Sequence, residues 1–551
     1  MEHKFMTPIQ MWEGYNPVKD PLETYIQKCN VLNDIAETEM YFTAESLKDG
    51  KIRVYSKMYA HKDWDTSHPA VLFLSDLNAS SNYVEISEML VEQGYVVFVV
   101  DYAGFMPDVE NPTSFPDSLK YASFEEAKHN LKYMGESARQ TPWFVWAKIA
   151  RRAITLMEEQ KIIDNEKINV VGFIHGAQLA WIVAAMDGRV NAAVPVMGCG
   201  HNSYGAKEVS VLESEEECCW VSGICPETYA RFVGCPILYA TSTNSLFANL
   251  DKAGEIMASV PSKNKCLVVA PRTNYQLTKE SLDSILLWAQ SAFKTECLSV
   301  PSPKASFKMS DGRLLYSLDT ELEPAEIETF ISFDNVLPPI RDWFTLPNPY
   351  VGQKVNYIVT PYDNTEKIFA FSNVKYKNGL IVSTSPVSIS KDGFEGVEKA
   401  PAVVENNRIV YTNKSGLGSF SIESYSLIVD DAQLKLKTGP FGIKGVSAES
   451  GYLRTNKLTK SSYAAEKTSI LKIDFYSKEP RDIRIQLFSF NTNKAYVAKC
   501  FLKGGERWQK VLLTPQDFKS DDGKPLTLFS DTQITLFKNV ASVIINNIIW
   551  I

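Results

Sequence analysis

Histidine is scarce in this chain and is absent from more than half of it. The 551 residues contain 6 histidines, and none follows His201. The other five are His3, His61, His68, His129 and His175. Any catalysis that needs an imidazole as its general base must therefore take it from the first part of the chain.

Long apolar runs and an excess of basic charge are also missing. No apolar stretch approaches the roughly 20 residues that cross a bilayer, so we expect no transmembrane segment and no membrane partner. The first residues lack a basic patch followed by an apolar core, so the sequence predicts no signal peptide and a cytoplasmic protein. The net charge of −8 disfavours a nucleic-acid partner.

The cysteines form no metal-binding or disulfide pattern. There are 9, an odd number, and none stands in a C-x-x-C motif. This pattern is typical of free thiols in a reducing compartment. We therefore expect no structural metal, and no motif in the sequence calls for a cofactor.

What the chain does contain is the composition of packed globular domains. Hydrophobic residues make up 45% and charged residues 22%. Up to Lys294 strand-like and helix-like segments alternate, for example the apolar run Tyr95–Val100 and the helical stretch Pro142–Gln160. The alternation predicts an α/β domain over 1–296, built on a doubly wound, mostly parallel sheet.

Helical periodicity largely disappears after this point. Segment 297–305 has the prolines and serines of a linker, and short strands with turns follow it. We expect a β-sandwich of immunoglobulin-like size over 297–400 and a second, jelly-roll sandwich over 401–551. The last strand, 543–551, is strongly apolar but is predicted to be interrupted at Asn546 and Asn547.

The most informative segment is INVVGFIHGAQLAW, residues 168–181, where a strand turns into a helix. Its Gly172-x-Ile174-x-Gly176 spacing is that of the G-x-S-x-G nucleophile elbow, in which small residues let strand and helix approach. With this elbow, and with the turn 101–104 after a buried strand, residues ~10–295 resemble the α/β-hydrolase fold. The similarity is to the dienelactone-hydrolase and acetyl-esterase-like branch.

The resemblance implies a serine–histidine–acid triad, and this chain departs from it at each part. Ile174 stands where the serine belongs, and isoleucine has no nucleophilic atom. Tyr275 occupies the expected histidine position, and the acid loop around Asn244 contains no carboxylate. Asp76 lies in the oxyanion turn, where negative charge is unfavourable. We therefore predict a degenerate catalytic site.

Several polar side chains are nevertheless expected at the carboxyl edge of the sheet. The candidates for binding are Asp76, Leu77, Asp101, His175, Cys199 and His201. For His175 the simplest interpretation is a partly exposed side chain, hydrogen-bonded to backbone or water. Two alternatives stay open: a Cys199–His175 nucleophile pair, and a metal site formed by several of these residues, which their spacing does not favour.

The two β-rich parts carry looser resemblances. Residues 504–518 resemble galactose-binding-like and carbohydrate-binding-module jelly rolls, which implies sugar binding on exposed aromatic rings. The candidate rings are Tyr452, Tyr463, Tyr476 and Tyr496, whereas Trp508 and Trp550 are predicted to be core anchors. Residues 338–343 resemble a segment of immunoglobulin-like appendages. We expect a structural corner there, and the alternative is an Arg341–Asp342 ion pair that holds Trp343.

Three functions follow from the sequence. The first is a catalytically degenerate esterase-like protein that binds or scaffolds a small molecule, a carbohydrate or an acylated glycan. The second is an esterase-like hydrolase that uses Cys199 and His175. The third is a structural protein that associates with itself or with a protein partner through its β domains.

Overall fold

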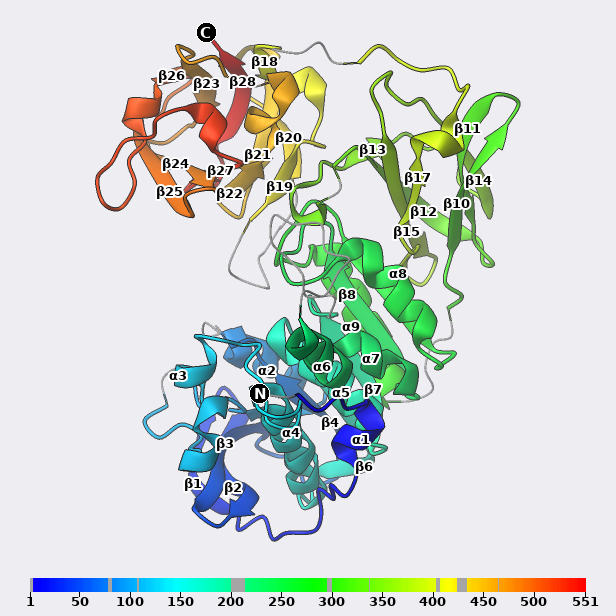
Figure 1. Ribbon diagram of the computed structural model, residues 1–551, viewed down its shortest axis with the longest axis vertical. Coiled ribbons are helices and arrows are strands. Elements are labelled where there is room, and N and C mark those ends of the chain that lie inside the picture. The colour runs from blue at the N-terminus through cyan, green and yellow to red at the C-terminus, as the bar shows by residue number, and fades with distance from the viewer. Residues whose placement is uncertain are drawn as a thin grey trace.

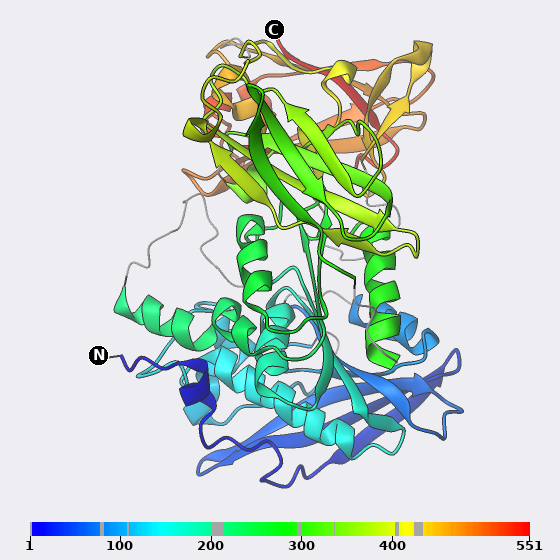
Figure 2. The ribbon, with the colours of Figure 1, turned by 90° about the vertical axis from the view of Figure 1, so that its right-hand side faces the viewer.

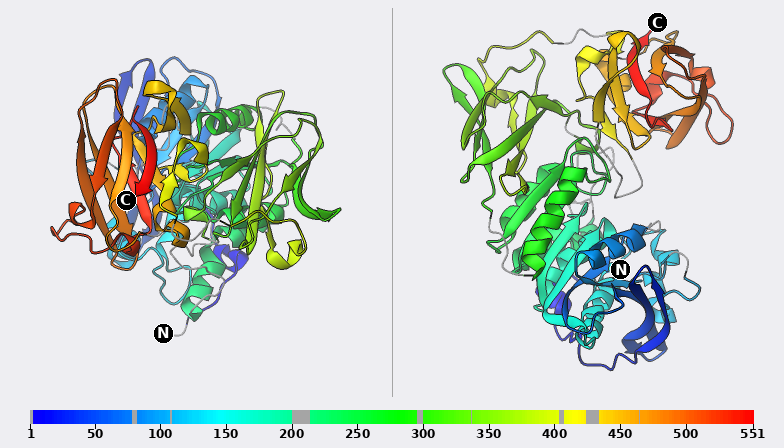
Figure 3. Two further views of the ribbon diagram at one scale, coloured as in Figure 1. Left: turned by 90° about the horizontal axis from the view of Figure 1, so that it is seen from above. Right: turned by 180° about the vertical axis from the view of Figure 1, so that it is seen from behind.

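The computed structural model describes residues 3–77, 82–106, 109–199, 214–294, 300–335, 337–402, 407–423, 434–463 and 465–551. Figure 1 shows an α/β part at one end and two β-rich parts at the other. The β-rich parts lie side by side, as the view from above in Figure 3 confirms. His201 and Cys297 lie outside the described residues.

The α/β part is built on a nine-stranded sheet in the order β1-β2-β3-β5-β4-β6-β7-β8-β9. Its strands are β1 (Tyr25–Leu32), β2 (Ile35–Leu47), β3 (Gly50–His61), β4 (His68–Leu74), β5 (Val96–Val100), β6 (Ile163–Phe173), β7 (Val190–Val196), β8 (Ile237–Ser242) and β9 (Lys265–Ala270). The six strands from β4 to β9 are parallel, as predicted, whereas β1, β2 and β3 are antiparallel additions.

Helices cover both faces of this sheet. The apolar run of β5 is buried on both sides, as this arrangement requires. Val96, Phe98 and Val100 belong to one core cluster, and Val97 and Val99 belong to the other. A strand buried on both faces has no polar alternation. The helices are α1 (Pro8–Trp12), α2 (Asn82–Glu92), α3 (Phe124–Ala127), α4 (Pro142–Glu158), α5 (His175–Met186), α6 (Glu215–Ile224), α7 (Pro226–Tyr229), α8 (Leu250–Ser259) and α9 (Lys279–Lys294). No helix of the described part is long and apolar enough to cross a bilayer.

The middle part is a sandwich of two antiparallel sheets. One sheet contains β10 (Lys304–Ser310), β11 (Arg313–Asp319) and β14 (Lys354–Val359). The other contains β12 (Pro324–Phe333), β13 (Phe344–Leu346), β15 (Lys367–Tyr376), β16 (Ile381–Ser383) and β17 (Val387–Ser390). Along β14 buried and exposed residues alternate strictly, which is the pattern of a strand with one face in the core.

The last part is a second antiparallel sandwich. One sheet holds β18 (Ile409–Tyr411), β20 (Leu434–Thr438), β21 (Lys444–Ala448), β23 (Leu471–Tyr476), β26 (Gln509–Leu513) and β28 (Ile544–Trp550). The facing sheet holds β19 (Phe420–Ile422), β22 (Tyr452–Thr455), β24 (Arg481–Ser489), β25 (Lys494–Leu502) and β27 (Ile534–Lys538). These sheets, with the α/β part, give the multidomain fold class expected from the sequence.

The predicted interruption of the final strand is wrong. β28 runs unbroken through Asn546 and Asn547, and the asparagines sit at an irregularity in its pairing with β23. Asn547 has φ 46°, a left-handed conformation that asparagine tolerates better than most residues. The strand therefore bulges where the sequence indicated a break.

The middle sandwich covers the β9 edge of the nine-stranded sheet. The backbone amide of Val269 donates to Ser383 Oγ over 2.8 Å, and Asn373 Nδ2 donates to the Val269 carbonyl over 3.0 Å. Side chains of β15 and β16 thus satisfy backbone groups that an open edge leaves unpaired. Figure 2 shows the middle sandwich standing directly on the end of the α/β part.

Candidate functional site

The predicted elbow is present, and isoleucine occupies its strained position. β6 ends at Phe173 and α5 begins at His175, with Ile174 between them at φ 50° and ψ −101°. A β-branched residue rarely adopts positive φ, at a cost of about 1–3 kcal/mol. A Cβ atom on Gly172 or Gly176 would collide with neighbouring backbone, so both glycines are required. The chain keeps the elbow geometry without its nucleophile.

His175 faces Asp76 beside this elbow. Its Nδ1 atom lies within hydrogen-bond distance of Asp76 Oδ1, and the two side chains are only 8% and 14% exposed. The prediction of a partly exposed histidine, bonded to backbone or water, is therefore wrong. Asp76, the acidic side chain in the expected oxyanion turn, therefore pairs with His175.

A row of aromatic rings fills the space around His175. Trp143 stacks on the imidazole at 6.0 Å between ring centroids, and Phe247 contacts it edge-on at 5.5 Å. Phe247 in turn lies 5.2 Å from Tyr275, the residue at the expected histidine position. Phe247 and Tyr275 thus lie near the positions where the resemblance implies the acid and the histidine of a triad. Trp143 and Phe247 were not identified from the sequence, although Phe247 follows directly on the acid loop.

Asp101 has a structural task. Its carboxylate accepts hydrogen bonds from the amides of Gly104, Phe105 and Thr113 at 2.8–3.0 Å, which closes the loop after β5. Its burial raises the pKa of this carboxyl. The pocket that Asp101 lines with Asp76 and Leu77 has a volume of about 20 Å³, which is room for a water molecule.

Cys199 is buried in one of the two core clusters of the α/β part. Burial raises the pKa of its thiol to about 12, so the reactive thiolate is essentially absent at neutral pH. Among the described residues, no group of three or more histidine, cysteine or acidic side chains is arranged to hold a metal ion. The remaining candidate, His201, lies outside the described residues.

The expected acid loop after β8 is bonded to the middle sandwich. Asn244 Nδ2 donates to the Arg341 carbonyl over 2.8 Å. Asp251, at the start of α8, accepts two hydrogen bonds from the Arg341 guanidinium at 2.6 and 2.8 Å. Arg341 thus pairs with Asp251, and not with Asp342 as the alternative interpretation of this segment required. Asp342 instead contacts Lys460 of the last sandwich, whereas the Arg341 side chain points toward α8.

The expected histidine loop after β9 is bonded to the last sandwich. Thr273 and Ile422 form a parallel β-bridge. The Ile422 amide donates to the Arg272 carbonyl over 2.8 Å, and the Asn274 amide donates to the Ile422 carbonyl over 3.2 Å. Arg272 Nε also donates to the Trp343 carbonyl over 2.9 Å. We call residues 241–245 and 272–275, with these partners, the joint.

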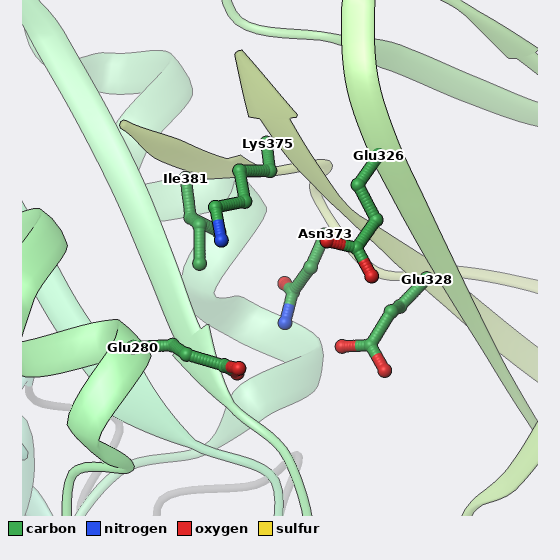
Figure 4. Close-up of a pocket in the computed structure, with 6 residues that line it drawn as sticks. All are labelled: Glu280, Glu326, Glu328, Asn373, Lys375 and Ile381. Atoms are coloured by element: carbon green, nitrogen blue, oxygen red, sulfur yellow. The ribbon is translucent and has the colours of Figure 1, made fainter. Parts of the chain in front are cut away.

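A small acidic pocket lies beside the joint, between α9 and the middle sandwich. Figure 4 shows the carboxylate of Glu280 reaching from the helix toward Glu328 and Asn373, with Glu326 and Lys375 nearby. Its volume is about 50 Å³. The pKa of Glu328 is raised by partial desolvation against the facing helix, although its side chain still reaches solvent, and by repulsion from Glu280 and Glu326. The pocket is small and its Asn373 bonds to β9, so it belongs to the domain contact.

The last sandwich exposes an aromatic surface that the sequence placed incorrectly. Trp508, predicted as a core anchor, is only half-buried. Its ring lies over Gly439, where any side chain would collide with it. Its Nε1 atom donates to the Pro440 carbonyl over 3.2 Å, and Tyr476 lies 6.0 Å from it. The neighbouring Phe441 is 89% exposed.

The other predicted rings of this sandwich lie elsewhere. Trp550 is 4% exposed and is a core anchor, as predicted. Tyr463 is also buried, and its carbonyl accepts a hydrogen bond from Trp550 Nε1. Tyr452 and Tyr496 are half-buried. Of the four candidate tyrosines, Tyr476 is thus the one in ring contact with Trp508.

Comparison with protein families matches residues 56–267 to the Dienelactone hydrolase family. Together with the strand order, this confirms the α/β-hydrolase fold of the first part. No curated protein matches the sequence.

Three solved structures illustrate the similarity. Acetyl xylan esterase from Paenibacillus sp. R4 is 12% identical, with a TM-score of 0.40 over 49% of this chain and 89% of that one. Acetyl Xylan Esterase 1 from Thermoanaerobacterium sp. JW/SL YS485 is 13% identical, with a TM-score of 0.39 over 50% and 89%. Glucuronoyl Esterase from Solibacter usitatus is 11% identical, with a TM-score of 0.36 over 50% and 88%.

Proposed function

We propose that this protein is an α/β-hydrolase-fold protein that lacks esterase activity and acts in binding or scaffolding. The observation that carries the proposal is the elbow, where the apolar side chain of Ile174 takes the nucleophile position. A serine esterase needs a hydroxyl at that point and an imidazole to remove its proton. The aromatic row and the joint occupy the places from which the base and its acid would come.

The organisation into three units supports a binding role. We place the domains at 1–296, 297–400 and 401–551, with the second holding the other two. The joint uses backbone pairing between Thr273 and Ile422, and beside it the Arg341–Asp251 ion pair makes two parallel hydrogen bonds, contacts that fix orientation. Loops that carry catalytic groups in an esterase thus serve to position the β domains.

For the ligand we propose a carbohydrate, bound by the last sandwich on the aromatic surface formed by Phe441, Tyr476 and Trp508. Exposed rings offer apolar faces to the C–H groups of a sugar ring. A highly exposed phenylalanine costs hydration free energy that a bound apolar face would recover. The resemblance of residues 504–518 to carbohydrate-binding modules points in the same direction.

The experiment has two arms. In the first, the purified protein is assayed with a panel of short p-nitrophenyl esters and acetylated sugars, and no turnover above buffer is expected. In the second, a glycan array is followed by titration calorimetry on wild type and Trp508→Ala. The control is Phe501→Ala, which removes a ring that is 61% exposed elsewhere on the sandwich. Binding that is lost in Trp508→Ala and kept in the control supports the proposal.

Two outcomes contradict it. Turnover of any ester that saturates with substrate would overturn the non-catalytic assignment. Glycan binding that is unchanged in Trp508→Ala would remove the aromatic surface as the sugar site.

The second candidate, a hydrolase using Cys199 and His175, finds less support. The thiol is buried with a raised pKa, whereas His175 makes its hydrogen bond to Asp76. A nucleophile and its base must be within hydrogen-bond reach of each other and of the substrate.

A further inference from the structure

The first strand of the sheet is an exposed edge. β1 pairs with β2 on one side, and no described segment pairs with its other side. Every residue of β1 is exposed. Figures 1 and 2 show β1 at the end of the molecule away from the β domains, so those domains do not cover it. An uncovered edge strand offers a row of backbone donors and acceptors to another strand.

The exposed apolar side chains of β1 stand at its two ends. Tyr25 and Ile26 are 59% and 61% exposed, and Val31 and Leu32 are 57% and 68% exposed. Between them lie the residues Gln-Lys-Cys-Asn. Read in either direction, the strand runs from two apolar residues through a more polar middle to two apolar residues. A second copy in antiparallel orientation therefore sets apolar ends against apolar ends.

The faces of the strand agree with such pairing. Tyr25 pairs with Tyr41 and Leu32 pairs with Ile35, positions of β2 that are six residues apart and share a face. By the same alternation Ile26, opposite Met40, and Val31, opposite Ala36, share the other face. In an unbulged strand, positions 25 and 32 would point to opposite faces.

The irregularity between Ile26 and Lys28 places Tyr25 and Leu32 on the same face of the strand. It takes Gln27 out of the regular alternation, as a β-bulge does. Two antiparallel strands related by a two-fold axis place equivalent residues on one face of the joined sheet. With Gln27 looped out, Tyr25 opposes Leu32 of the other copy and Ile26 opposes Val31. Lys28 opposes Asn30, so no like charges meet.

We propose that two copies of this chain associate through antiparallel pairing of their β1 strands, with the two Cys29 residues facing each other on the symmetry axis. The uncovered edge makes pairing possible, and the polarity pattern together with the bulge favours a second copy over an unrelated strand. The proposal does not rest on the ligand or on the loss of catalysis.

Light scattering on the full chain tests the association. Wild type is expected at twice its 61.9 kDa mass. Ile26→Lys combined with Val31→Lys places charges against charges at both ends of the paired strands, and should weaken association at least about tenfold. Both side chains are exposed, so the fold is unaffected. The matched control is Phe501→Lys on the edge strand β25, where the side chain is also 61% exposed.

Cys29 reports which face is used. Opposed residues of antiparallel strands have Cα atoms about 4.5–5.5 Å apart, within the range that a disulfide spans. A mild added oxidant takes two electrons and two protons from the two thiols and should yield a covalent dimer. Cys29→Ser should abolish the cross-link and keep the dimer seen by light scattering.

Three results would overturn the proposal. The first is a wild-type monomer at about 100 μM, well above a micromolar dissociation constant. The second is a dimer that survives Ile26→Lys with Val31→Lys. The third is a dimer in which Cys29 does not cross-link, since association would then use another surface.

Discussion

Arg341 and Asp251 join the middle sandwich to the α/β part by two parallel hydrogen bonds of 2.6 and 2.8 Å. The arginine side chain is fully buried, whereas the aspartate is 29% exposed. The guanidinium also lies 3.6 Å from the centroid of the Phe369 ring. Geometry of this kind fixes direction as well as distance.

Arg341→Met should therefore loosen this contact. Removing the guanidinium deletes two charge-assisted hydrogen bonds and leaves the partly exposed Asp251 carboxylate unpaired, at a cost of about 1–3 kcal/mol. Urea unfolding followed by fluorescence should show an earlier first transition. Lys391→Met is the control, because its pair with Glu366 is 45% and 67% exposed and such pairs are worth about 0–1 kcal/mol. Equal effects of the two variants would contradict the importance of the buried pair.

Ile174→Ser restores the hydroxyl of the elbow and should not restore esterase activity. The imidazole next to position 174 belongs to His175, whose Nδ1 atom is already paired with Asp76 Oδ1 and whose ring packs against Phe247. The loss of a side chain that is only 7% exposed should lower stability by about 1–3 kcal/mol. Ester hydrolysis and thermal unfolding measure the two effects. Turnover that inhibitors of serine esterases abolish would show that a base is within reach after all.

Cys199 should resist thiol reagents in the folded protein. Its thiol is fully buried with a pKa of about 12, whereas Cys29 is exposed. Mass mapping after brief treatment with a thiol reagent at pH 8 should find Cys29 modified and Cys199 unmodified. In urea both should react. Labelling of Cys199 at a rate close to that of Cys29 in the native protein would reopen the cysteine-hydrolase alternative.

Glu328 should make the protein less stable as pH rises. Its pKa in the folded state is raised above the ordinary 4.5, first by partial desolvation and then by Glu280 and Glu326. The folded state therefore holds this proton more tightly than the unfolded state, and stability falls as pH rises through the window above 4.5. Glu328→Gln should exceed wild type in melting temperature near pH 7 and match it near pH 4.

The control for this prediction is Glu395→Gln, an exposed carboxylate outside the pocket. The difference in melting temperature between Glu395→Gln and wild type should stay constant across the same pH range. A Glu328→Gln variant whose advantage does not grow with pH would contradict the assigned cause.

Much of the fold could be predicted because it rests on local patterns. The run of β5, the helix α4 and the strand-to-helix elbow each leave a periodic or glycine signature within a few residues. β1 leaves no such trace: it is exposed on both faces and lacks the alternation of a half-buried strand. The bulge at Asn547 was mistaken for a break because asparagine pairs are typical of turns.

The sequence predicts which groups of a triad are missing and names Asp76 and His175 as candidates, but it does not predict that these two residues pair. Ile174 and the scarcity of histidine are visible in the sequence, whereas the residues that contact this region come from distant positions. Asp76 lies 99 residues before His175, and Arg341 lies 90 residues after Asp251. Neither pairing follows a spacing rule, since both depend on how the sheet and the sandwiches meet. Adjacency in sequence is no better a guide, since Arg341 pairs with Asp251 and its neighbour Asp342 pairs with Lys460.

The covered β9 edge sets a limit on how far copies of this chain can assemble. A sheet with two open edges can add neighbours on both sides and grow into a fibre. Here the described residues 373 and 383 bond to the backbone of Val269 at one edge, and only β1 remains open at the other. When two β1 strands pair about a two-fold axis, each uses the single open edge of the other. Assembly through the sheet then ends at two copies.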